Sequence, residues 1–146
     1  MEQVMVIGCN GIGNPLSTVS RYASFRTAEI LRERGVEVEI MAIGRLLGRL
    51  DEDVEAAKRS RVALMEGCSF RCAKKLLKNL GIEISTYVYI PEVMLRSGIS
   101  RRGLDRKFLG PKGKALVEAV AQFTADAVCR ASEPATEPIA VEGACE

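Results

Sequence analysis

The chain has 146 residues, of which 47% are apolar and 27% are charged, and its formal net charge is +2. This length and composition are typical of one soluble domain with a hydrophobic core, and the small net charge excludes a molecule built as a whole to attract nucleic acid. The sequence contains no histidine, which excludes histidine-based acid–base catalysis and every metal site that needs an imidazole ligand.

The first residues, MEQVMVIGCNG, predict a cytoplasmic protein. An acid stands where a signal peptide carries lysines, and the apolar run is too short for a secretion signal. No segment reaches the roughly 18 consecutive apolar residues of a membrane span, so we expect no membrane partner. The number of cysteines, five, is odd and argues against a disulfide framework, so we expect reduced thiols.

The first part of the chain predicts a strand, a helix and a second strand. Residues 4–7, VMVI, form a continuous apolar run that ends in a glycine, which is typical of a strand buried on both faces. After a glycine-rich turn, residues 17–35 predict a helix that is capped by Ser17 or Thr18 and stopped by a glycine. Residues 36–40, VEVEI, alternate strictly, which indicates a strand near an edge of the sheet.

The middle of the chain predicts two more strands and two helices. We expect residues 42–50 to be irregular, and the acids that open residues 51–58 predict a short helix. Residues 62–65, VALM, are a second fully apolar strand, and residues 69–81 follow as a helix whose leucines recur at helical spacing. Residues 84–90, ISTYVYI, predict a fourth strand that a proline stops.

The last part of the chain predicts one helix and a tail. Residues 112–130 carry an apolar stripe at helical spacing, so we expect a helix there. Residues 131–146 hold two prolines, four glutamates and no base, a composition typical of a disordered acidic tail. We therefore expect a single domain over residues 1–130, followed by this tail.

Strands that alternate with helices predict an α/β fold, namely a three-layer α/β/α sandwich around a four-stranded, mostly parallel sheet. The two most apolar strands, 4–7 and 62–65, should be central neighbours. Residues 36–40 then lie outside the first and residues 84–90 outside the second, which is the strand order 2-1-3-4 with right-handed crossovers. In this order the winding reverses between the two central strands, and ligands bind at such a reversal, outside the carboxyl ends of the strands.

Three cysteines are predicted to meet at this reversal. Cys9 follows the first central strand, Cys68 follows the other, and Cys72 lies on the first turn of the next helix. Because neighbouring strands lie about 4.8 Å apart, Cys9 and Cys68 should face each other across the crevice. Helix N-termini at this edge favour thiolates, and Gly8 and Gly67 would let the backbone approach closely.

Two interpretations of these cysteines remain open on the residues alone. Cysteine often only fills a core, and Cys72 shares a helical row with Leu76, as a core residue would. The C-x3-C spacing is also not that of a thioredoxin-like site or a zinc knuckle. The convergence of three thiols at one edge instead favours a functional cluster.

The turn over residues 8–15, GCNGIGNP, is similar to the beginning of a P-loop, but Asn14 and Pro15 replace the Lys-Ser/Thr pair that contacts phosphate. The third glycine of a dinucleotide fingerprint is also missing, so we expect no nucleotide. Plain anion binding at this turn stays open. The residues that would provide it are Asn10, Gly11, Gly13 and Asn14.

Residues 96–114 form a basic segment with seven basic residues and one acid, a local charge of +6. Arg101 and Arg102 could bind an acidic partner there, or the segment could be a solvated connection over which the acidic tail folds. Because the bases are not interleaved with aromatic residues, nucleic acid is the less favoured partner. The sequence leaves the partner and the oligomeric state open, a homo-oligomer included.

The motif GC-x3-C-A-K-K that begins at Gly67 resembles the signature of the DGC-domain family. These are small prokaryotic proteins of unknown function that are described as candidate zinc-binding proteins. In that family an acid-Gly-Cys triplet ends a strand, and another cysteine follows the first strand before a Gly/Ser/Asn-rich turn, as Cys9 does before NGIGN. The resemblance covers about residues 4 to 90.

The resemblance implies a zinc site made by Cys9, Cys68 and Cys72, and the chain departs from the family pattern in two places. The family's aspartate is Glu66 here, and Met41 stands where a further cysteine would be expected at the end of the second strand. Structural zinc takes a closed tetrahedral set, so three thiolates would leave an open site. Glu66, Met41 or water would then be the fourth ligand, although the thioether of methionine suits softer metals than zinc.

Three functions follow from these observations. The one that we favour is a metal-binding protein with zinc at the three cysteines. A thiol-based redox or sulfur-transfer enzyme would use the same cysteines as nucleophile and second thiol. A non-catalytic module that binds a partner or an anion would use the basic 96–114 segment. Only the second of these is an enzyme, so the sequence leaves catalysis open.

Overall fold

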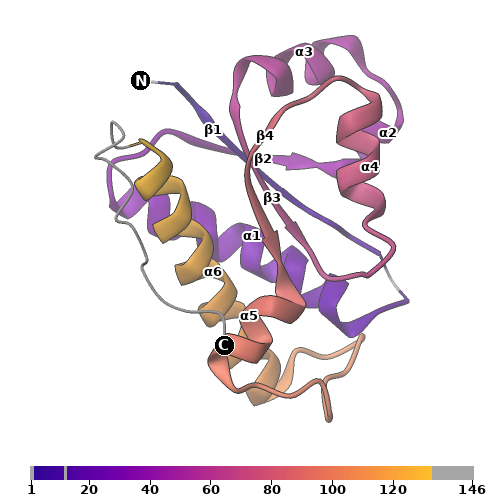
Figure 1. Ribbon diagram of the computed structural model, residues 1–146, viewed down its shortest axis with the longest axis vertical. Coiled ribbons are helices and arrows are strands. Elements are labelled where there is room, and N and C mark those ends of the chain that lie inside the picture. The colour runs from indigo at the N-terminus through magenta and orange to yellow at the C-terminus, as the bar shows by residue number, and fades with distance from the viewer. Residues whose placement is uncertain (1, 12, 133–146) are drawn as a thin grey trace, which may run out of the picture.

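The computed structural model describes residues 2–11 and 13–132, and its four strands form one parallel sheet in the order β2-β1-β3-β4 (Figure 1). The strands are β1 (Val4–Gly8), β2 (Val38–Ala42), β3 (Arg61–Glu66) and β4 (Ile84–Tyr89). The α/β class and the strand order predicted from the sequence are therefore confirmed. Both central strands, β1 and β3, are the apolar runs that the sequence placed at the centre.

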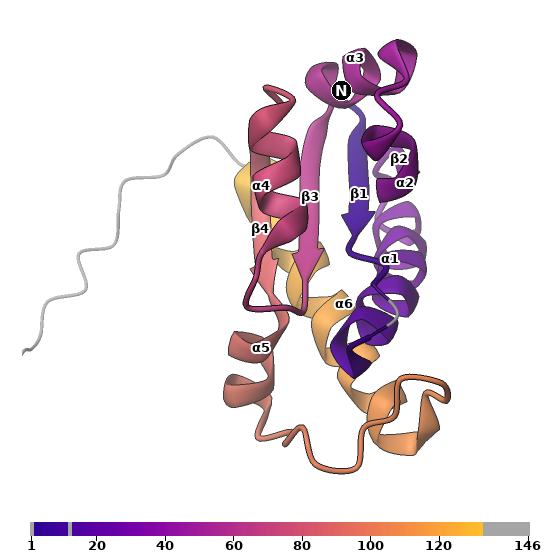
Figure 2. The same ribbon diagram turned by 90° about the vertical axis from the view of Figure 1, so that its right-hand side faces the viewer.

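The described residues also form six helices, which cover both faces of the sheet (Figure 2). The helices are α1 (Pro15–Glu33), α2 (Ile43–Leu47), α3 (Asp51–Arg59), α4 (Cys72–Asn79), α5 (Ile90–Ser97) and α6 (Gly110–Ser132). Helices α1, α5 and α6 pack into one hydrophobic core, and α2, α3 and α4 pack into the other. No helix in the described part of the chain is long and apolar enough to cross a membrane.

The two cores lie on opposite faces because successive side chains of a strand point in opposite directions. In β1, Val4 and Val6 belong to the core beneath α1 and α6. Met5 and Ile7 belong to the core beneath α2, α3 and α4. A strand buried in this way needs apolar residues at every position, which is why VMVI shows no alternation.

Helix α1 begins earlier than the sequence predicted. Asn14 is its N-cap, with Oδ1 accepting a hydrogen bond from the Leu16 N–H at 2.9 Å, and Pro15 occupies the first turn. The prediction of Ser17 or Thr18 as the cap is wrong, because both residues lie inside the helix. Proline at the start of a helix, which was interpreted as part of the turn, is a usual position for this residue.

Four other boundaries differ from the predictions. Strand β2 lies two residues further along than 36–40, although its edge position is confirmed. Residues 43–47, which we expected to be irregular, form α2. Helix α4 begins at Cys72 rather than at residue 69, because Arg71 has a left-handed backbone with φ of +51°. Helix α5, which the prediction missed, begins at Ile90, and Pro91 lies in its first turn, where proline is tolerated.

The last helix is longer than predicted at both ends, since α6 includes residues 131 and 132. The predicted start of the acidic tail at residue 131 is therefore two residues too early, and the rest of that predicted tail, residues 133–146, lies outside the described residues. Along its length α6 packs beside α1 on the same face of the sheet. The prediction of one domain over residues 1–130 stays a prediction.

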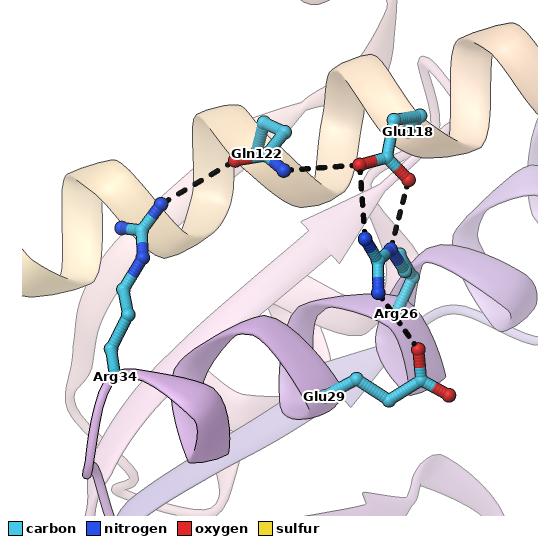
Figure 3. Close-up of polar contacts among 5 residues, drawn as sticks. All are labelled: Arg26, Glu29, Arg34, Glu118 and Gln122. Carbon is cyan, nitrogen blue, oxygen red and sulfur yellow. Dashed lines mark hydrogen bonds and ion pairs between the residues drawn. The ribbon is translucent and has the colours of Figure 1, made fainter.

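Polar side chains connect α1 and α6 on their solvent side (Figure 3). Arg26 donates from Nε and Nη2 to the two carboxylate oxygens of Glu118, at 2.9 and 3.3 Å. Gln122 donates to the same carboxylate at 3.0 Å, and these hydrogen bonds hold the pKa of Glu118 below its usual value. Because the side chains are exposed, water screens these contacts, and the apolar core beneath contributes more to stability.

Two glycines let α1 approach the carboxyl ends of the central strands, as expected from the sequence. A Cβ atom on Gly8 would lie 2.3 Å from the Ser24 Oγ, and a Cβ atom on Gly67 would lie 2.5 Å from the Leu16 Cβ. Cβ atoms essentially never approach a neighbour closer than 3.0 Å. The helix can therefore reach this edge only because both positions lack a side chain.

The close approach at Gly67 predicts a loss of stability in Gly67→Ala. The new methyl group would overlap the Leu16 side chain and its carbonyl group, and overpacking of this kind costs roughly 1–3 kcal/mol of unfolding free energy. Chemical denaturation measures this change. Gly44→Ala is the matched control, because no atom lies within 4 Å of its added Cβ. Equal stability of the two variants would contradict the packing described here.

Candidate functional site

A cavity of about 350 Å³ opens at the carboxyl ends of β1 and β3, where the winding of the sheet reverses. Its walls come from the turn after β1, the start of α1, the loop before α4 and the first residue of α4. Cys9, Cys68 and Cys72 all line it. The fold thus brings to one cavity the three cysteines that are far apart in the sequence.

Cys9 is the buried member of the three, with 5% of its surface exposed. Its Sγ accepts a hydrogen bond from the Gly67 N–H at 3.4 Å and donates to the Ser17 Oγ at 3.9 Å. Its backbone N–H donates to the Met65 carbonyl at 3.1 Å, which extends the pairing of β1 with β3. The sulfur is therefore held by both central strands and by α1.

Cys68 and Cys72 are more accessible than Cys9. Cys68 is half-buried and Cys72 is exposed at the first position of α4. Between them the chain makes a tight turn, in which the Arg71 N–H donates to the Cys68 carbonyl at 3.0 Å. All cysteines in the described part of the chain are free thiols, and Cys129, on α6, lies outside the cavity.

Glu66, the last residue of β3, is fully buried and binds the N-terminus of α4. Its Oε1 accepts hydrogen bonds from the Ala73 N–H at 2.7 Å and the Lys74 N–H at 3.3 Å. Its Oε2 accepts a hydrogen bond from the Tyr87 hydroxyl at 2.8 Å. A carboxylate at this position satisfies unpaired helical N–H groups and complements the helix dipole. Both oxygens are therefore used in holding α4 to the sheet.

Met41 is 2% exposed at the end of β2, where it pairs with Ile7 of β1. Its side chain belongs to the hydrophobic core that also contains Ile7 and Cys9. The described residues that line the cavity include neither Met41 nor Glu66. The sequence offered these two residues as a fourth ligand, and in this structure each has a different role.

Two tyrosines of β4 complete the surroundings of α4. The Lys74 Nζ lies 4.5 Å from the centre of the Tyr87 ring, and the Arg71 guanidinium lies 4.8 Å from the centre of the Tyr89 ring. Both are cation–π contacts. Sequence reasoning missed these tyrosines, although the alternation in TYVYI already put both of them on one face of the strand.

The turn and the basic segment meet beside the cavity. Gly11, Gly13 and Asn14 line it, and Asn10 is exposed next to them. The Oδ1 of Asn14 accepts hydrogen bonds from the Leu16 N–H and, at 3.2 Å, from Arg101. An anion needs hydrogen-bond donors, so the backbone N–H groups of the turn, and not this acceptor oxygen, are what could bind one. Anion binding there stays a prediction.

In the part of the chain that the structure describes, none of the seven bases of the basic segment forms an ion pair. Its one acid, Asp105, accepts hydrogen bonds from the backbone N–H groups of Lys107 and Phe108, which lower the pKa of Asp105. Arg102 is exposed. The segment therefore presents a basic surface close to the cavity, and binding of an acidic partner there stays a prediction.

The donor atoms fit a thiophilic metal, but their arrangement is not that of a finished metal site. Among residues 2–11 and 13–132, no group of three or more Cys, His, Asp or Glu side chains is arranged to hold a metal ion. The Cys9 Sγ accepts a hydrogen bond from Gly67, whereas Cys68 and Cys72 lie at the two ends of a turn. A metal bound by all three thiols would therefore need some of these side chains to change position.

The hydrogen bonds of Glu66 predict a loss of stability in Glu66→Gln. The uncharged amide accepts weaker hydrogen bonds from α4, and the unfolding free energy should fall by about 1–3 kcal/mol. Thermal or chemical denaturation measures the difference. Glu55→Gln is a suitable control, because Glu55 is exposed and contacts only Lys58 on the same helix. A Glu66→Gln protein as stable as the control would contradict the role assigned to Glu66.

The environment of Tyr87 predicts that the protein loses stability at alkaline pH. Burial, followed by the hydrogen bond to Glu66, raises the pKa of Tyr87 above its ordinary value of 10.0. The unfolded chain then ionises first, so the stabilisation is complete below about pH 10 and is lost as the pH rises further. The unfolding free energy of the wild type should fall more steeply above this pH than that of Tyr87→Phe. If the unfolding free energies of the two proteins fell equally with pH, that result would contradict a raised pKa of Tyr87.

Comparison with known proteins identifies the family of this chain. Residues 5–107 match the model of the DGC domain, a span that includes the three cysteines of the cavity together with Glu66. No curated protein and no solved structure matches the chain. Because the match extends over more than half of the sequence, this chain belongs to the DGC-domain family.

Proposed function

We propose that this protein binds a thiophilic metal ion, with zinc as the first candidate, through the thiolates of Cys9, Cys68 and Cys72. The observation that carries the proposal is that three thiols from three separate segments line one cavity at the reversal point of the sheet. A core that merely used cysteine as a small apolar residue would not leave Cys72 exposed at the mouth of a cavity.

The ligand chemistry supports a soft or borderline metal. Thiolates bind zinc at about 2.3 Å, and the chain has no histidine to complete a mixed set. Since Glu66 and Met41 have other contacts, the fourth position would be open to water or to an external ligand. An open fourth position is the feature that separates sites that exchange ligands from purely structural zinc sites.

The residues around the cavity would stabilise the three cysteines as thiolates. The Gly67 N–H already donates to the Cys9 Sγ, and this hydrogen bond becomes stronger when the sulfur is a thiolate. Three thiolates and one divalent ion carry a net charge of −1, which the cations of Arg71, Lys74 and Lys75 at the start of α4 would offset in part. Glu66 keeps the first turn of α4, and with it Cys72, at this edge.

The proposal predicts about one zinc ion per chain, which Cys68→Ser and Cys72→Ser should lose. Elemental analysis of protein purified with zinc measures the stoichiometry, and cobalt substitution reports thiolate ligands through its charge-transfer absorption. Cys129→Ser is the matched control, because that half-buried thiol lies on α6 outside the cavity. Circular dichroism of each variant excludes a loss of metal that is caused by unfolding.

Two results would contradict the proposal. Zinc that is retained equally by Cys68→Ser and Cys129→Ser would place the metal elsewhere. A wild-type protein that binds neither zinc nor cobalt, while Cys72 reacts rapidly with disulfides, would instead support a thiol-based redox or sulfur-transfer function at the same cavity.

A further inference from the structure

The thiol cavity adjoins a second cavity of about 280 Å³ on the side of α2 and α4. Cys9, Gly11 and Cys72 line both cavities. The other residues that line the second cavity are Asn10, Ile43, Leu47, Ala73 and Leu76, and none of them is charged. Two of the three thiols, Cys9 and Cys72, therefore stand between the thiol cavity and a cavity whose lining is uncharged.

The apolar cavity is not simply a gap in the core. Leu47 is 62% exposed on α2, and Ile43 and Leu76 are only partly buried. Large apolar side chains gathered around a cavity remain in contact with water unless something covers them, and such exposed apolar groups are typical of binding sites. The lining of the first cavity combines an apolar side chain, Phe70, with the polar side chains of Asn14 and Ser17.

The volume limits what can occupy this space. A cavity of about 150 Å³ with an apolar lining is large enough to hold benzene. A space of about 280 Å³ therefore admits an aryl group or a short branched alkyl group. The absence of charged residues from its lining, as far as the structure describes it, also disfavours an ionic ligand.

Building on the proposed function, we infer that the two adjoining cavities together bind a small uncharged ligand that combines a thiophilic metal or metalloid centre with an apolar organic group. Cys9 and Cys72 bond the centre, because these two thiols face both cavities. Ile43, Leu47 and Leu76 receive the organic group. This inference depends on the thiol site of the proposed function and adds to it the class of ligand that the site selects.

A trivalent organoarsenical is a probe with this chemistry. Its R–As=O group reacts with two thiols, so that two As–S bonds form and the As=O bond breaks. The two thiol protons leave with the oxide oxygen as one water molecule. Arsenic stays in the trivalent state, so the reaction needs neither an oxidant nor a reductant. The organic group R is not changed, and it can be varied while the bonds to sulfur stay the same.

The test compares phenylarsine oxide with methylarsine oxide, two probes that differ only in the organic group. Each affinity for the full chain is divided by the affinity of the same probe for a small dithiol in solution, which removes the intrinsic difference in As–S bonding. After this correction, the wild-type protein should prefer the phenyl probe by about tenfold, because the apolar cavity buries the ring. Protein fluorescence or calorimetric titration measures the affinities.

The matched variants are Leu47→Ser and Leu95→Ser. Leu47 lines the apolar cavity, whereas Leu95 lies on α5, is 85% exposed and lines neither of the two cavities. Both leucines are exposed, so neither substitution should unfold the protein. Leu47→Ser should weaken binding of the phenyl probe about threefold to tenfold and leave binding of the methyl probe unchanged. Leu95→Ser should change neither affinity.

Two outcomes would overturn the inference. One is an equal corrected affinity for the two probes, and the other is a Leu47→Ser variant that binds both probes as the wild type does. Neither outcome contradicts the proposed function, provided that Cys72→Ser binds neither zinc nor the two probes. If Cys72→Ser binds both probes as well as Cys129→Ser does, the thiol site itself is wrong, and the two failures are thereby distinguished.

Discussion

The edge of the sheet that carries the cavity depends on one buried carboxylate. Glu66 ends β3, binds the first N–H groups of α4 and receives the hydroxyl of Tyr87 from β4, so three elements meet at its two oxygens. A buried charge without partners would be strongly unfavourable, and here α4 and β4 both supply hydrogen bonds to it. The position of Cys72 follows directly, because it is the first residue of the helix that Glu66 holds.

The next residue extends the same arrangement to the other central strand. Gly67 donates its N–H to the Cys9 sulfur, and its missing side chain leaves room for Leu16 of α1. An acid, a glycine and a cysteine in succession thus bind a helix, admit a second helix and place a thiol at the cavity. The three adjacent residues have different physical tasks, which gives a reason for the acid-Gly-Cys order that does not need the acid to touch a metal.

Much of the fold could be predicted from the sequence, because strands buried on both faces need continuous apolar runs that are easy to recognise. The two continuous apolar runs identified the central strands, and with them the edge at which the cysteines meet. Features that depend on one residue's surroundings were harder to predict. Asn14 and Pro15 were interpreted as a turn, and Pro91 as a stop, although proline suits the beginning of a helix as well as the end of a strand. The partners of Glu66 could not be foreseen, because they come from segments that only the fold brings together.

Arg71 gives the cavity a further property. A left-handed backbone at a residue other than glycine costs roughly 1 kcal/mol, and in this chain the cation–π contact with Tyr89 accompanies that conformation. A turn of this kind lies closer in energy to its alternatives than a relaxed turn does. Cys68 and Cys72 therefore lie on either side of a strained residue, and the energy released when its backbone relaxes would offset part of the cost of moving these two thiols around a bound ligand.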